Sequence, residues 1–92
     1  MAVSNSAGQD IDLRESIGAT LSRRVTATHL ADLTGYTPFF RLGGVEQVVT
    51  VTGNYFEFSL PTSGIVHGTA YEIGWVVGGK TRVLCKGKVL LT

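Results

Sequence analysis

From residue 19 onward, hydrophobic and polar side chains alternate with a period of two, which is typical of strands with one buried face. The clearest example is residues 55–60, where Phe56, Phe58 and Leu60 share one side of the segment. The same pattern predicts strands at residues 20–29, 36–42, 45–52, 55–60, 70–77 and 80–91. Since no segment has a convincing helical period with caps, the chain is predicted to be all-β.

Glycine and proline mark the breaks between these segments. Gly53-Asn54 and Gly78-Gly79 are typical of two-residue hairpin turns. Pro38 predicts an edge or a strand start, and Gly87 predicts a bulge or bend in the last strand. Turns about every 8–12 residues favour an antiparallel, immunoglobulin-like β-sandwich of about six to seven short strands, with a small closed barrel as the alternative.

The N-terminal residues have a different composition. Residues 1–14 are rich in serine, asparagine, glycine and aspartate and contain few large apolar side chains. Such a stretch buries too little surface to offset the entropy lost on ordering. We therefore expect residues 1–14 to form an extended N-terminal arm and residues 15–92 a single β-sandwich domain.

Composition narrows the function classes. The 92 residues carry a net charge of +1, and 43% are hydrophobic while 16% are charged, so disorder is excluded and one domain is expected. The small net charge predicts no nucleic-acid partner and no attraction to anionic lipid. No segment approaches the roughly 20 apolar residues needed to cross a membrane. The single cysteine, Cys85, and the lack of a visible signal peptide favour folding in a reducing cytoplasm.

One motif has the spacing of a phosphate-binding loop but lacks the structural context that such a loop needs. Residues 74–81 satisfy the phosphate-loop pattern G-x-x-x-x-G-K-[ST], but Trp75 and its two valine neighbours favour a strand, so a glycine hairpin is expected. His29 and His67 lack zinc-ligand spacing. We predict no catalytic, cofactor-binding or metal-binding residues, no small-molecule substrate and no enzymatic activity.

Two charge features need an explanation. Alternation sends Arg23 and Arg24 to opposite faces of the first strand, so one arginine either extends along a solvent-facing edge or forms an ion pair. The second feature is a basic stripe in the last strand, which we interpret as protection of a sheet edge. Its residues are Lys80, Arg82, Lys86 and Lys88.

Several short segments, taken in order, resemble a known family. They are the Ala-Asp-Leu-Thr-Gly turn at residues 31–35, Phe-Phe-Arg-Leu at 39–42, the strand at 55–61, Gly-Thr-Ala-Tyr-Glu-Ile at 68–73, and Cys-Lys-Gly-Lys-Val at 85–89. This order is similar to the small β-sandwich domains of tailed-phage virion proteins, above all the N-terminal domain of upper-baseplate tail accessory proteins. The resemblance extends over residues 17–92 and carries no catalytic signature.

The resemblance implies a virion structural protein that is assembled in the host cytoplasm. Because no second domain follows Thr92, it favours a capsid decoration or cement protein, with a head–tail or tail/baseplate accessory subunit as the alternative. The expected partners are major capsid or tail proteins and further copies of the chain itself.

Partner binding is expected to use the arm and the second predicted strand, since large aromatic and arginine side chains dominate interface energetics. The predicted partner-binding residues are Ile11, Leu13, Arg14, Tyr36, Phe39 and Arg41. A second alternative is a module that recognises a carbohydrate or receptor. It would use exposed aromatic side chains, for which Tyr36, Tyr55 and Trp75 are the candidates.

Overall fold

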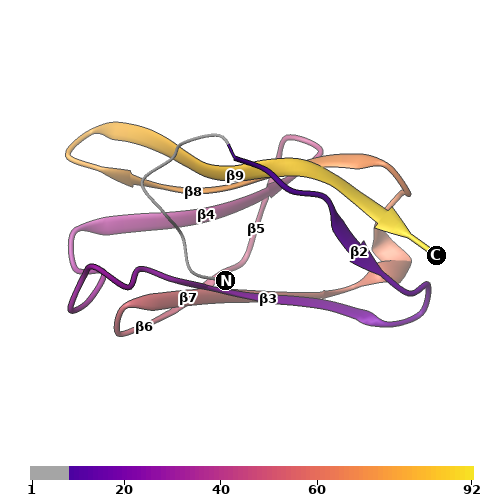
Figure 1. Cartoon of the computed structure of the whole chain (residues 1–92), viewed down its shortest axis with the longest axis horizontal. Helices are drawn as coiled ribbons and strands as arrows, with labels where there is room; N and C mark the ends of the chain where they lie inside the picture. The colour runs from indigo at the N-terminus through magenta and orange to yellow at the C-terminus, as the bar shows by residue number, and fades with distance from the viewer. Residues whose placement is uncertain (1–8) are drawn as a thin grey trace.

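The computed structural model describes residues 9–92, which form two β-sheets packed face to face (Figure 1). One sheet has the strand order β1-β9-β8-β4-β5, with β2 also paired to β9, and the other has the order β3-β7-β6. The elements are β1 (Gln9–Asp10), β2 (Leu13–Glu15), β3 (Thr20–Thr26), β4 (Tyr36–Leu42), β5 (Val45–Gln47), β6 (Thr50–Thr52), β7 (Tyr55–Pro61), the short 3-10 helix η1 (Thr62–Gly64), β8 (Thr69–Val77) and β9 (Lys80–Leu91).

The architecture confirms the predicted all-β, immunoglobulin-like sandwich. Neighbouring strands such as β3 and β7, or β4 and β8, are distant in sequence, so the chain crosses repeatedly between the two sheets. The Gly78-Gly79 hairpin joins β8 to β9, as expected, and both glycines have positive φ values of 60° and 76°. The described residues contain more strands than the six to seven predicted, and two pairings, those of β1 and β2 with β9, are parallel.

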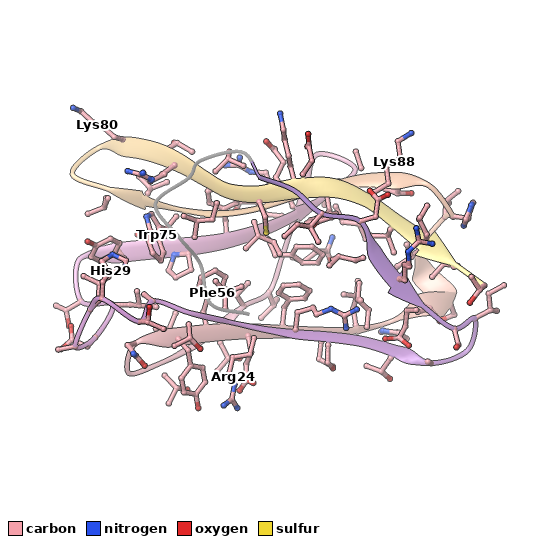
Figure 2. All side chains as sticks on the ribbon, viewed as in Figure 1. Arg24, His29, Phe56, Trp75, Lys80 and Lys88 are labelled. Atoms are coloured by element: carbon pink, nitrogen blue, oxygen red, sulfur yellow. The ribbon has the colours of Figure 1, made fainter. Side chains whose placement is uncertain are left out.

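The core lies between the two sheets and is built from the inward side of the alternating strands. The rings of Phe40 from β4 and Phe58 from β7 stack across the interface with centroids 3.8 Å apart. Phe56 points from β7 into the same space, as Figure 2 shows, and is fully buried. Trp75 and Cys85 are also buried. Burial of each large side chain contributes about 1.5–3 kcal/mol to stability.

Residues 45–52 form two short strands instead of the single strand predicted. β5 belongs to the sheet of β4, whereas β6 pairs with β7 in the other sheet, so the chain changes sheet at Val48 and Val49. Val45, Val49 and Val51 keep the same parity across this crossing, so the sequence pattern does not reveal it. Pro38 lies where β4 has no neighbour on its β5 side, because β5 pairs only with residues 40–42.

Gly87 does not form the bulge that the sequence predicts. The register of β8 and β9 shifts between Ile73 and Gly74, which leaves Leu84 as the extra residue. At Gly87 a Cβ atom would lie 2.8 Å from the carbonyl carbon of Ile11. This glycine therefore allows the N-terminal strand to approach β9 closely.

Candidate interaction surface

The sandwich has two lateral sides, where the edges of its sheets meet. We call the first the closed side; it consists of residues 9–15 together with β3. We call the second the open side; it consists of residues 45–52, which carry β5 and β6. Figure 1 shows the N-terminal strands following β9, with the β5–β6 crossing elsewhere on the molecule. The two sides differ in what covers the edge.

On the closed side, the N-terminal strands pair in parallel with β9. The register places Gln9 opposite Cys85 and Leu13 opposite Val89. Between the two strands, the Ile11 backbone N–H donates to the Lys86 carbonyl at 2.8 Å. These bonds involve main-chain groups, so polar side chains do not prevent the segment from completing a sheet.

Side chains reinforce this pairing at its centre. The hydroxyl of Tyr71 donates a hydrogen bond to the carbonyl oxygen of Ile11. The Oδ1 atom of Asp12 accepts a hydrogen bond from the Lys88 backbone N–H at 3.1 Å. Leu13 is only 6% exposed and belongs to the hydrophobic core. Residues 9–15 are thus an integral part of the sandwich.

Arg23 joins the two sheets across the closed side. Its guanidinium group donates to the Arg14 carbonyl at 3.2 Å and lies 3.7 Å from the Glu15 carboxylate. Arg24, which points away from the sandwich in Figure 2, lies 3.3 Å from the carboxylate of Glu57. Each arginine therefore has a carboxylate partner within the chain, and β3 is an edge strand, as the first of the two sequence interpretations expected.

A small apolar cavity remains between β3 and the N-terminal segment. It has a volume of about 200 Å³, and Arg23 and Arg24 contribute to its wall. Its apolar lining comes from Ile11, Leu13, Val25 and Ile73. Packing on the closed side is therefore less dense than in the core.

Burial changes the acidity of two groups next to the N-terminal strand. Burial raises the pKa of the Tyr71 hydroxyl above its ordinary value of 10.0, and the neighbouring Cys85 acts in the same direction. Burial also raises the pKa of the Cys85 thiol above 9.0, although a hydrogen bond with Tyr71 opposes that shift. Both groups are accordingly held in their neutral forms.

The open side exposes apolar side chains instead. Val48 is 87% exposed, Val45 is 63% exposed and Val51 is 47% exposed. We call these three residues the valine cluster. They lie in or between two strands, β5 and β6, that each pair on one side only among the described residues. Exposed β-branched side chains beside an unpaired strand edge are typical of a surface that binds another chain.

A shallow groove adjoins the valine cluster on the outer face of the β3-β7-β6 sheet. It has a volume of about 510 Å³, and Val48 and Thr50 form its rim. On its floor the hydroxyls of Ser22 and Ser59 are hydrogen-bonded at 2.9 Å. The surface thus combines an apolar edge with a polar, internally satisfied floor.

The predicted anchors of β4 are engaged within the molecule. Phe39 is only 5% exposed, because the guanidinium group of Arg41 lies 4.0 Å above its ring. Arg41 also lies 3.5 Å from Glu46 and 3.8 Å from Glu72. Tyr36 packs edge-on against Trp75, with ring centroids 5.0 Å apart. These three side chains thus have contacts within the chain, and a partner-binding role for them stays a prediction.

The predicted anchors of the arm also have contacts within the domain. Leu13 is a core residue and Ile11 packs against the core, because the segment joins the β9 edge of its own domain. Arg14 is exposed, and its carbonyl accepts the bond from Arg23. The part of the predicted arm at residues 1–8 lies outside the described residues.

The basic stripe lies only partly on a sheet edge. The N-terminal strands pair with residues 85–86 and 89–91 of β9, so Lys80 and Arg82 lie where β9 pairs with β8 alone among the described strands. Lys80 and Lys88 lie near opposite ends of β9 and point away from the sandwich in Figure 2. Lys86 is paired in register with both Asp10 and Glu72, so its surroundings are acidic.

The other candidate residues lie apart from one another. His29 is exposed, whereas the Nδ1 atom of His67 accepts a hydrogen bond from the Leu91 backbone N–H at 2.9 Å. Within residues 9–92 no group of three or more histidine, cysteine or acidic residues is placed to hold a metal ion. The described part of the chain also contains no helix of the length and apolarity that spanning a membrane requires.

The aromatic candidates for carbohydrate recognition are covered in the same way. Trp75 is buried, and the guanidinium group of Arg24 lies 4.1 Å above the Tyr55 ring. Recognition of a sugar ring by stacking needs an open aromatic face, which these two side chains do not present.

Comparison with known proteins assigns no family to the chain. No protein-family model matches the chain, and no curated protein matches it. The proposals below therefore depend on the surfaces described above and on the resemblance noted in the sequence.

Proposed function

We propose that the chain is a non-enzymatic bacteriophage virion structural protein, a capsid decoration or cement protein that docks in many copies on the particle surface. The observation that carries this proposal is the valine cluster, where Val48 is 87% exposed beside two strand edges. The resemblance of residues 17–92 to tailed-phage sandwich domains supplies the biological setting.

The open side suits repeated docking on a particle. Apolar side chains at its centre gain free energy when a partner removes them from water, by about 25 cal/mol per Å² of buried apolar area. The unpaired edges of β5 and β6 offer main-chain hydrogen bonds to an extended segment of the partner. A modest interface is sufficient where many copies bind one particle.

The proposed partner is a major capsid or tail protein that presents an apolar, weakly charged strand at its surface. Residues 45–52 carry one charged side chain, Glu46, whose carboxylate is already engaged by Arg41. A strongly charged partner segment would find no complement there, so the charge pattern favours an apolar one.

The test is quantitative mass spectrometry of purified virus particles from the source culture. We expect the chain to co-purify with the particles, with copies on the order of hundreds for a decoration protein and about six or twelve for a head–tail or tail ring. Absence of the chain from the particles would overturn the proposal.

A matched pair of variants tests the surface. Val48→Asp places a charge in the valine cluster, whereas Val66→Asp places one at a 75% exposed valine in the loop between η1 and β8. We expect only Val48→Asp to lower particle binding in co-sedimentation, by tenfold or more, where tenfold corresponds to about 1.4 kcal/mol. Equal binding by both variants would show that the valine cluster is not the docking surface.

A further inference from the structure

The described strands leave four sheet edges that a second chain could extend. They are β3 and β6 in the smaller sheet, and β5 and the β1–β2 segment in the larger one. The β1–β2 edge carries Asp10, Arg14 and Glu15. Two further stretches are unpaired on one side: residues 36–39 of β4 contain Pro38, which has no N–H to donate, and residues 80–84 of β9 contain Lys80 and Arg82. The edges differ in charge. β3 contains Arg23 and Arg24, and β5 contains Glu46, whereas β6 has the uncharged sequence Thr50-Val51-Thr52.

Charge decides which edge suits an identical partner. Two copies that pair about a two-fold axis bring each edge against itself, and like charges in directly opposed positions are destabilising. Pairing through β3 would bring arginines together, and pairing through β5 would bring two Glu46 carboxylates together. β6 can pair with its own copy without opposing like charges.

We propose that β6 pairs antiparallel with β6 of a second copy of this chain, about a two-fold axis at Val51. This register opposes the two Val51 side chains and places Thr50 of each copy opposite Thr52 of the other. Valine and threonine pairs of this kind stabilise antiparallel strands. The smaller sheets of the two copies then form one continuous sheet in the order β3-β7-β6-β6-β7-β3.

The faces of β6 support this register. Val51 is paired with Phe56, whose side chain points into the core, so Val51 lies on the inner face of its sheet. Its 47% exposure arises at the rim of that face, where a second copy would cover it. Thr50 and Thr52 are paired with Glu57 and Tyr55 on the outer, polar face. The two-fold pairing therefore places valine with valine inside and threonine with threonine outside.

The size of the contact predicts a weak dimer. β6 contains three residues, and the described surface area of the chain is 5221 Å². A standard stable interface buries about 800 Å² per partner, which a three-residue strand and its neighbours do not reach. The dimer is therefore expected to depend on protein concentration. It goes beyond the proposed function, because it forms in solution without any particle.

Sedimentation velocity over a concentration series tests the proposal. We expect the full chain to move from monomer to dimer as its concentration rises. Val51→Lys introduces a charge at the two-fold axis and is expected to raise the dimer dissociation constant tenfold or more, because lysine on an edge strand opposes edge pairing. The matched control, Val66→Lys, places the same charge at an exposed loop valine and should leave the constant unchanged.

Disulfide trapping tests the register independently of folding stability. In a Cys85→Ser background, Val51→Cys is expected to form a covalent dimer under mild oxidation, since opposed Cβ atoms lie about 4.5–5.5 Å apart. Val66→Cys in the same background is the control for random collision. Equal trapping of both variants, or a chain that stays monomeric at every concentration, would overturn the proposal.

The two proposals fail separately. Loss of dimerisation by Val51→Lys with unchanged particle binding would support the β6 pairing and remove β6 from the particle interface. Particle binding by a chain that never dimerises would overturn the β6 pairing and leave the proposed function standing.

Discussion

The closed and open sides of the sandwich differ in the kind of segment that lies at the sheet edge. On the closed side, a polar segment with few apolar side chains covers the β9 edge by main-chain hydrogen bonds and buries Leu13. On the open side, a valine-rich segment that would suit a core leaves Val48 almost fully exposed. The comparison teaches that side-chain hydropathy does not decide which edge of a small sandwich is covered.

The physical reason lies in where the bonding groups are. Strand pairing uses backbone N–H and C=O groups, which every residue except proline offers equally. Residues 9–15 have β9 beside them as a partner, and Gly87 leaves room for the approach. Residues 45–52 cross from one sheet to the other, so their two short strands, which like β1 and β2 have a partner on one side only, belong to different sheets.

The largest expected effect comes from removing the buried side chain of the closed side. Leu13→Ala deletes core contacts next to the existing 200 Å³ cavity, so we expect the free energy of unfolding to fall by about 3 kcal/mol. Urea unfolding measures this loss. Val45→Ala, at a 63% exposed position on the open side, is the control and should change stability by less than about 0.5 kcal/mol. Equal losses would mean that the closed side is not part of the core.

Gly87→Ala tests the close approach that allows residues 9–15 to dock. A Cβ atom at this position would collide with the carbonyl group of Ile11, so we expect a loss of about 1–3 kcal/mol. Hydrogen exchange should also speed up at Ile11, whose N–H bonds to Lys86. Gly64→Ala is the matched control, because nothing lies within 4 Å of its Cβ position. Unchanged exchange at Ile11 would contradict the proposed role of Gly87.

Alkaline pH should weaken the closed side through Tyr71 and Cys85. Their pKa values are raised by burial, so the unfolded chain releases these protons at a lower pH than the folded chain. The stability that depends on the neutral forms is present below about pH 9 and is lost as pH rises. The loss reaches at most about 1.4 kcal/mol per pH unit for each group.

Tyr71→Phe separates the two contributions. It removes the titrating hydroxyl, together with the hydrogen bond to Ile11, so the variant should be less stable at neutral pH and lose less stability above pH 10. Urea unfolding at a series of pH values measures both slopes. Identical slopes in the two proteins would show that the pKa of Tyr71 is the same in the folded and unfolded chains.

The sequence predicted the parts of the fold in which alternation and turn chemistry agree. β4, β7 and β9 lie where the pattern places them, and the hairpin at Gly78-Gly79 replaces the apparent phosphate loop. The docking of residues 9–15 was missed because main-chain pairing has no side-chain signature. The distinction between Gly87, which permits a close approach, and Leu84, which forms the bulge, depends on a strand that is distant in sequence.

The candidate surface was also missed. Aromatic and arginine residues were favoured as anchors, yet Phe39 and Arg41 satisfy each other on one sheet face. The signal available in the sequence was the run of valine and threonine at residues 45–52 with a single charge. That signal is ambiguous, because the same composition is typical of a buried strand. Only the crossing between the sheets determines that these side chains face solvent.

The smallest expected effect concerns Val48, and it separates stability from binding. Since its side chain is 87% exposed, Val48→Ala removes almost no buried area, and the free energy of unfolding should change by less than about 0.5 kcal/mol. If the open side is an interaction surface, the same substitution should still weaken particle binding, because the apolar area lost is area that only the complex buries. A variant that unfolds like the parent chain but binds particles less tightly would place the role of Val48 in association. A variant that binds unchanged would instead make Val48 one of the scattered surface apolar residues that folded proteins commonly carry.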